Sequence, residues 1–185
     1  MTEPLDPMDP RTAYEAADQA IRAGDSGRLM ELAAAAPFLI TNHRLEEDED
    51  ALLVRAVNYS PRGILGLRLV ETILDLGADV DFCPPWGFTA LFEAADNQDV
   101  AMVGLLIKRG ANPNILELPE DEGPPDYVLD IVELEIALQE NRHAEMGEPD
   151  RDPGGVMPLI RDMLKQAGAK GYYELHPEEL GQHTH

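Results

Sequence analysis

The sequence predicts an all-α protein built as an array of about four short helix pairs, and three observations support this prediction. Apolar residues recur at helical spacing from Thr89 to Gly110, with a turn in the middle, which indicates two consecutive helices. Gly77 and Gly110, each followed by Ala, lie 33 positions apart, so the helix pair is repeated. Aromatic residues make up only 5% of the chain, as small stacked helices require. Because helices this short cannot bury an apolar face alone, the array needs neighbouring copies.

The domain organisation follows from the spacing of these units. We expect one folded domain over residues 12–175 between two flexible tails. The segments are a tail at 1–11, units at about 12–40, 46–81, 84–114 and 124–170, an inserted loop at 141–158 within the last unit, and a tail at 176–185.

The first unit has lost the opening motif of the later ones. Thr12 and Glu15 have the spacing of a capping box, which predicts that the first helix begins near Thr12. A second helix is predicted from Arg28 to about residue 36, where Pro37 ends it. An atypical first unit is what the end of a stacked array needs.

The second unit is longer than the third. Asp50 is taken to correspond to Thr89, and the distance from Asp50 to Gly77 then exceeds that from Thr89 to Gly110 by six residues. We expect the extra residues in a loop within 58–66, because insertions in repeat proteins map to loops.

The third unit carries two motifs. It opens with Gly-Phe-Thr-Ala-Leu-Phe-Glu-Ala-Ala at 87–95 and closes with Leu-Leu-Ile-Lys-Arg-Gly-Ala-Asn-Pro-Asn at 105–114. Both segments resemble the ankyrin repeat, which implies an ankyrin-repeat solenoid whose β-turn fingers and first helices form a concave, protein-binding surface. Phe92 stands where the family has His, so we expect it to contribute by packing.

The last unit is the least regular. A helix is predicted from Tyr127 to about Glu140 and another over 159–169. Lys165 takes the position that Leu74 and Ile107 hold in the inner units, which indicates that no further repeat covers it. We expect three apolar residues to pack back over this end: Tyr172, Tyr173 and Leu175.

The net charge of −22 is the main compositional feature. Such a surface repels nucleic acids and anionic membranes and attracts basic partners, although solubility alone is an alternative explanation. No apolar run approaches the roughly 18–20 residues of a membrane span, and the N-terminus lacks the pattern of a signal peptide. We therefore expect a cytoplasmic protein.

Motifs of catalysis and of metal binding are absent from the sequence. It has no phosphate-binding glycine loop, nucleophile elbow, H-E-x-x-H or zinc-spaced cysteines, so we expect neither an enzyme nor a cofactor. Cys83 is expected to be an inert turn residue, because no basic group nearby in sequence would activate it. His183 and His185 lie in the C-terminal tail, where a metal site would lack fixed geometry.

Acidic runs and one aromatic segment are the predicted partner-binding site. Two acidic runs lie in or beside fingers, without the spacing of a calcium loop, and the only Trp lies between them. As alternatives, Asp50 and Asp126 can simply cap helices, and Trp86 can pack against a neighbouring finger. The predicted residues are Glu46, Glu47, Asp48, Glu49, Asp50, Trp86, Phe88, Glu120, Asp121, Glu122 and Asp126.

These observations give one leading hypothesis and two rivals. The leading one is a non-catalytic protein, monomeric when free, that captures a basic protein partner on its acidic concave face. A sharper form is an inhibitor or immunity protein that fills the basic groove of a toxic enzyme such as a nuclease. The first rival is an accessory or scaffolding subunit that recognises a neutral surface. The second is a metal-dependent enzyme that uses clustered carboxylates.

Overall fold

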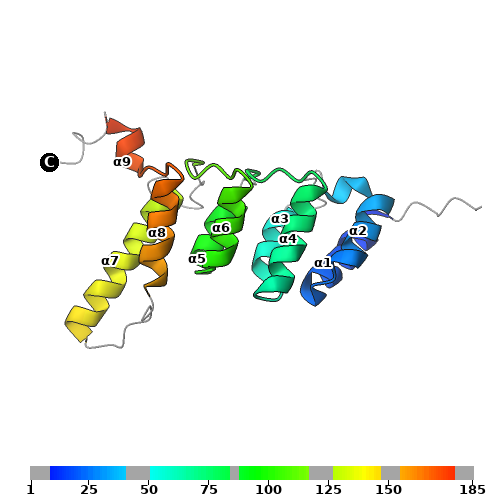
Figure 1. The fold of residues 1–185 in the computed structure, drawn as a ribbon, viewed down its shortest axis with the longest axis horizontal. Coiled ribbons are helices and arrows are strands. Elements are labelled where there is room, and N and C mark those ends of the chain that lie inside the picture. The colour runs from blue at the N-terminus through cyan, green and yellow to red at the C-terminus, as the bar shows by residue number, and fades with distance from the viewer. Residues whose placement is uncertain (1–8, 41–50, 84–87, 117–126, 147–154, 178–185) are drawn as a thin grey trace, which may run out of the picture. The chain divides into compact units, whose positions relative to one another are not determined.

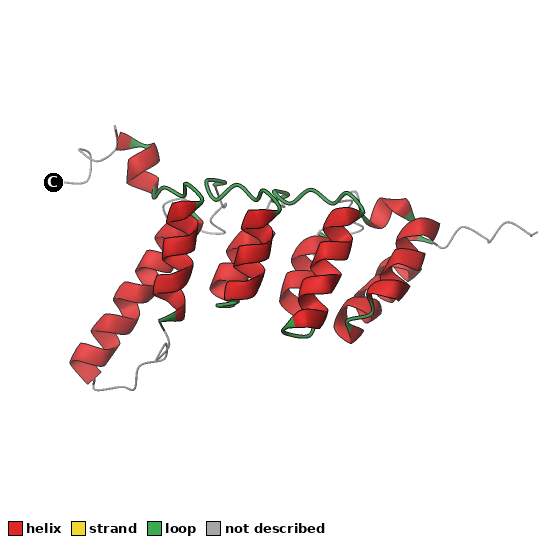
Figure 2. Cartoon of the chain, in the orientation of Figure 1, coloured by secondary structure: helices red, strands yellow, loops and turns green. Residues whose placement is uncertain are grey.

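The computed structural model confirms the all-α prediction in the residues that it describes, whose regular structure is entirely helical (Figure 2). The chain divides into two compact units, Met1–Pro84 and Pro85–His185, and each contains two helix pairs. The described ranges are 9–40, 51–83, 88–116, 127–146 and 155–177, without the side chains of 142–146.

The first unit consists of two antiparallel helix pairs and a short 3₁₀ turn (Figure 1). The first helices of the pairs, α1 and α3, pack together, and so do the second helices, α2 and α4. Its largest fully buried side chains are Ile21, Leu29, Leu32, Leu53, Leu69 and Ile73. The bounds are α1 Pro10–Ala23, α2 Ser26–Ala35, η1 Pro37–Leu39, α3 Leu52–Tyr59 and α4 Ile64–Asp75.

The start of α1 differs from the prediction, because Asp9 and not Thr12 caps the helix. The Asp9 carboxylate accepts the backbone N–H groups of Arg11 and Thr12 at 3.1 and 3.2 Å, and it also accepts the Thr12 hydroxyl. These hydrogen bonds hold the pKa of Asp9 below its usual value. Pro10 takes the first helical position, where a missing N–H costs nothing.

The extra residues of the second unit lengthen helices, and the predicted long loop is wrong. The N-cap of α3 is Ala51, whereas Asp50 lies outside the described residues. α4 has 12 residues and α6, its counterpart in the second unit, has 9. The loop from Ser60 to Gly63 is consequently short. It passes so close to α4 that a Cβ at Gly66 would collide with the Pro61 carbonyl oxygen.

The second unit contains two more helix pairs and a short terminal helix (Figure 1). Here α5 packs on α7 and α6 packs on α8, as in the first unit. The largest fully buried side chains are Leu91, Leu106, Leu129, Met157, Ile160 and Leu164. The bounds are α5 Ala90–Asp96, α6 Val100–Lys108, α7 Val128–Met146, α8 Val156–Gln166 and α9 Tyr172–Leu175.

The local signals at the ends of α5 and α6 are confirmed. The Thr89 hydroxyl accepts the Phe92 backbone N–H at 3.2 Å and so caps α5. Gly110 follows α6 with a φ of +93°, and the next N–H bonds back to the Leu106 carbonyl. Gly77 after α4 and Gly168 after α8 have φ values of +99° and +92°, so the three helices end alike.

α7 is longer than the sequence predicts. The expected end near Glu140 is wrong, because the helix runs on to Met146. α8 begins at Val156, so both ends of the predicted insertion at 141–158 are helical. α7 is therefore longer than α5, the first helix of the regular pair.

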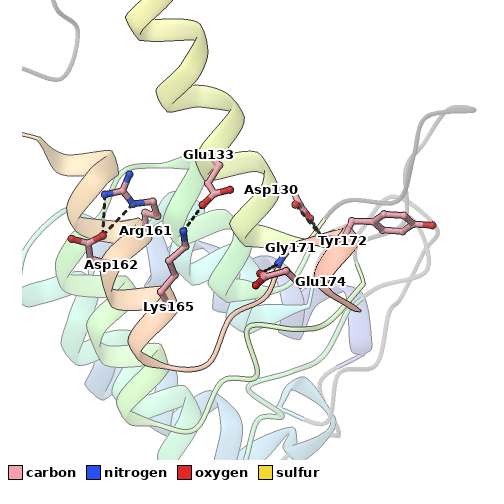
Figure 3. A network of polar contacts seen from close by, with 8 residues as sticks. All are labelled: Asp130, Glu133, Arg161, Asp162, Lys165, Gly171, Tyr172 and Glu174. Carbon is pink, nitrogen blue, oxygen red and sulfur yellow. Dashed lines mark hydrogen bonds and ion pairs between the residues drawn. The ribbon is translucent and has the colours of Figure 1, made fainter. Parts of the chain in front are cut away.

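The end of the second unit is held by carboxylates of α7 and α9 (Figure 3). Asp130 accepts the Tyr172 backbone N–H at 2.9 and 3.1 Å, and Glu174 accepts the Gly171 N–H at 3.0 Å. Lys165 is exposed, as predicted for this position, and forms an ion pair with Glu133 at 2.6 Å. Tyr172 packs near the Tyr127 ring as expected, but Tyr173 is 48% exposed.

Candidate partner-binding groove

Of the predicted partner-binding residues, the structure describes only Phe88. Its ring is half-buried and stacks on Phe92, with ring centroids 4.2 Å apart and planes inclined by 9°. The other predicted residues lie outside the described ranges: Glu46, Glu47, Asp48, Glu49, Asp50, Trp86, Glu120, Asp121, Glu122 and Asp126.

The Phe88–Phe92 stack adjoins a groove between α5 and α7. The groove encloses about 290 Å³, at the small end of the range for ligand pockets, so it suits a few inserted side chains better than a whole cofactor. We call it the α5–α7 groove. Its apolar lining is Phe92, Ala95, Val128, Ile131, Val132, Leu134, Leu138 and Met157.

α7 brings more apolar residues to this groove than its own packing uses. Val128, Leu129 and Val132 are buried in the core, whereas Leu134 is 54% and Leu138 is 44% exposed. Apolar residues one turn apart form a stripe on one side of a helix, so the two leucines extend the groove along α7. The sequence reasoning missed both, although the surplus of apolar residues between 128 and 138 was a usable signal.

The rim of the groove is acidic. Asp96 and Glu135 are among the lining residues, and the described lining includes no Lys or Arg. Gln139 donates a hydrogen bond to Glu135 at 2.9 Å, which positions that carboxylate on α7. The α5–α7 groove therefore combines an apolar floor with a negative edge.

Gln98 completes the rim from the turn between α5 and α6. Its φ of +56° is the only positive value among the non-glycine residues that the structure describes. Its N–H bonds to the Ala95 carbonyl, and the next N–H bonds to the Ala94 carbonyl, which ends α5 sharply. Gly24 has the equivalent conformation after α1, at a φ of +67°, without the strain that a side chain adds.

A second hollow, of about 440 Å³, lies between α7, α8 and α9, but its polar groups already serve the fold (Figure 3). Glu133 pairs with Lys165, Asp130 anchors the start of α9, and Glu174 caps the same helix. Because these charges are already engaged with groups of the protein, we take the α5–α7 groove as the candidate functional site.

Two other kinds of site have no support within the described residues. No group of three or more His, Cys, Asp or Glu residues there is arranged so that it could hold a metal ion. None of the described helices is long and apolar enough to cross a membrane. Cys83, the only cysteine in the sequence, is half-buried.

Comparison with known proteins identifies one segment. The family model of the ankyrin repeat matches residues 86–117, as the sequence motifs predict. No curated protein matches the sequence. Among solved structures, the chain resembles a chain of "Bd0816 Predatory Endopeptidase from Bdellovibrio bacteriovorus in complex with immunity protein Bd3460". The identity is 21%, the TM-score is 0.48, and the match covers 84% of this chain and 82% of that chain.

Proposed function

We propose that this ankyrin-repeat chain is a non-catalytic protein-binding module whose α5–α7 groove takes a basic, apolar segment of a partner protein. The observation that carries the proposal is the groove itself, which leaves Leu134 and Leu138 about half exposed beside Asp96 and Glu135. A fold shared with other proteins does not by itself carry a function, so the proposal rests on these side chains.

The apolar floor supplies affinity. Removing apolar surface from water contributes roughly 25 cal/mol per Å², and two half-exposed leucines on one stripe offer such surface to an inserted side chain. The floor is pre-formed, since Phe92 is held by its stack on Phe88 and Val132 is fully buried. A partner segment with two or three apolar side chains on one face matches this floor.

The negative charge of the protein favours partner segments that carry positive charge. Asp96 and Glu135 lie at the rim, and the net charge of −22 adds a long-range attraction for cations. Lys or Arg residues flanking the apolar side chains of the partner would meet this rim. The acidic runs 46–50 and 117–126 contribute to the same net charge, and their direct contact with a partner remains a prediction.

The test uses a fluorescein-labelled amphipathic peptide of about four helical turns, with Leu along one face and Lys elsewhere. Fluorescence anisotropy should show binding that Leu134→Gln with Leu138→Gln weakens by about tenfold or more. Leu159→Gln is the matched control, because Leu159 lies on α8 outside the groove and is 49% exposed. Equal affinities of the wild type, the double variant and Leu159→Gln would show that net charge alone binds the peptide. This result would overturn the proposal that the groove is the binding site.

Salt separates this proposal from the rival subunit that recognises a neutral surface. Raising NaCl from about 0.05 to about 0.5 M shortens the Debye length several-fold and should weaken binding of the Lys peptide. Replacing its Lys residues by Gln should remove that dependence. Tighter binding of the Gln peptide than of the Lys peptide at low salt would favour the neutral-surface rival.

The narrower form of the proposal is inhibition of a basic toxic enzyme such as a nuclease. Its motivation is the charge of −22 together with a groove that accepts an apolar anchor. We expect equimolar inhibition of the susceptible nuclease to weaken with salt and with neutralisation of residues 46–50. An affinity that neither change alters would count against the inhibitor hypothesis.

A further inference from the structure

The first unit carries a positively charged surface cluster at the contact between α1 and α3. Its charge is opposite in sign to that of the rim of the α5–α7 groove. Asp18 on α1 accepts hydrogen bonds from the Nε atoms of Arg22 at 2.9 Å and of Arg55 at 2.5 Å. Tyr59 on α3 lies against both arginines, whose Cζ atoms are 4.6 and 4.9 Å from its ring centroid. We call these four residues the Arg–Tyr patch.

The Arg–Tyr patch has one more positive charge than negative. Two guanidinium groups share the single Asp18 carboxylate, and each uses its Nε atom for that contact. The hydrogen bonds that the structure describes for the two arginines are donated by Nε and not by a terminal Nη atom. Two adjacent Nη groups are the donors with which arginine recognises a carboxylate.

The patch is pre-organised and reaches the surface. Cation–π contact with Tyr59 and the bonds to Asp18 hold both arginine side chains, so less rotamer freedom remains to be lost on binding. The Arg22 side chain is 51% exposed and Tyr59 is 43% exposed, whereas Arg55 lies deeper at 20%. Arg and Tyr are the residue types that most often anchor protein interfaces.

Exposed apolar side chains lie at the start of α4, shortly after Tyr59 in the chain. Ile64 is 64% and Leu65 is 47% exposed. Leu65 lies beside the end of α1, since its Cβ is 3.2 Å from the position that a Cβ on Gly24 would occupy. A bound segment could therefore place one carboxylate on the arginines and an apolar side chain on Leu65.

We propose that the Arg–Tyr patch binds a Glu or Asp side chain of an acidic, apolar-containing peptide segment of a partner protein. This proposal is independent of the α5–α7 groove, because it concerns the other unit and the opposite charge. The net charge of −22 opposes the approach of an acidic segment, but physiological salt weakens this long-range repulsion beyond a Debye length of about 8 Å more than it weakens direct contact with the patch. The same net charge disfavours the long phosphate backbone of a nucleic acid.

The test uses the full chain and an amphipathic peptide of about four helical turns with Leu on one face and Glu elsewhere. At about 0.15 M NaCl, fluorescence anisotropy should show binding that Arg22→Gln weakens by about tenfold. Tyr59→Leu, which leaves the charge unchanged, should also weaken it. Circular dichroism checks that each variant is folded.

Arg28→Gln is the matched control. Arg28 is also 51% exposed and pairs with an acid on its own helix, Glu31, so the two substitutions remove the same charge from equally accessible arginines. Arg28→Gln should change the affinity less than about twofold. Equal losses in both Arg variants would reduce the effect to general electrostatics and overturn the patch.

Three further outcomes would overturn the proposal. The first is a wild-type protein that fails to bind the Glu peptide. The second is a dimer in sedimentation that Arg22→Gln dissociates, because the occupant is then a second copy. The third is an Arg22-dependent complex with a single-stranded oligonucleotide tighter than that with the Glu peptide. Leu134→Gln with Leu138→Gln should leave Glu-peptide binding unchanged, which keeps this test separate from that of the groove.

Discussion

In the first unit, the neighbouring first helices α1 and α3 are joined by charged and aromatic side chains, whereas in the second unit α5 and α7 meet through an apolar floor. The Arg–Tyr patch lies at the outer edge of the first contact, with Asp18 on one helix and Arg55 on the other. At the second contact, Phe92 and Val132 pack in the core and the continuation of α7 leaves an open groove.

The comparison shows that one backbone plan accommodates two surface chemistries. In both units the inward residues of the first helices are buried, so the plan depends on those inward positions. The side chains at the outer edge of each contact are not fixed by that requirement. They are therefore where a cationic patch can form in one unit and an acid-rimmed groove in the other.

Phe92→Ala should break the α5–α7 side of this comparison and has the largest expected effect. Phe92 is 7% exposed and stacks on Phe88, so truncation removes buried apolar surface and leaves a cavity. We expect a loss of about 3–5 kcal/mol in the free energy of unfolding, measured by urea denaturation. Phe88→Ala, at a half-buried position, should cost less. A negligible change in Phe92→Ala would show that this side chain does not support the second unit.

Asp18→Asn should break the α1–α3 side. Burial raises the pKa of Asp18, but the hydrogen bonds from Arg55 and Arg22 outweigh it, so the pKa lies below the ordinary value of 3.8. At neutral pH the substitution should lower the free energy of unfolding by about 2 kcal/mol. It weakens charged hydrogen bonds and leaves the two guanidinium groups without the anion that they share.

The pH dependence gives that prediction its sign. Since the folded state lowers the pKa of Asp18, its stabilisation is complete above pH 3.8 and is lost as the pH falls through the lower folded value. Urea titrations should thus show the difference between wild type and Asp18→Asn shrinking in acid. Asp162→Asn, at a 58% exposed side chain, is the control and should differ little from wild type. A difference that persists undiminished in strong acid would contradict the ion-pair explanation.

Gln98→Gly tests the turn after α5 against the turn after α1, and its expected effect on stability is the smallest of the three. Gln98 adopts a positive φ after α5 at the position that Gly24 holds after α1. Relief of the left-handed conformation should raise the free energy of unfolding by about 1 kcal/mol, seen as a higher melting temperature. The reciprocal Gly24→Ala should be destabilising, since its Cβ would also crowd Pro61 and Leu65. Loss of stability in Gln98→Gly would mean that the Gln side chain supports the turn.

Local features of the fold were within reach of the sequence. The Thr89 cap, the glycines that end α4, α6 and α8, and the apolar faces of α5 and α6 depend on residues within one or two helical turns. The ankyrin motifs over 86–117 are equally local. Two predictions about helix ends were wrong, and both concern residues close together in the chain. Asp9 caps α1 where Thr12 was expected, and residues 141–146 continue α7 where a loop was expected.

The sequence by itself determined the helical class, the repeat spacing and the ends of the regular helices, because these follow from backbone preferences and short-range periodicity. Only the tertiary structure decided which side chains meet across helices. Arg55 reaches Asp18 from 37 residues away, Lys165 of α8 pairs with Glu133 of α7, and Leu134 stays exposed although Val132 on the same helix is buried. Such contacts depend on helix packing and on the length of α7, and both candidate binding surfaces arise from them.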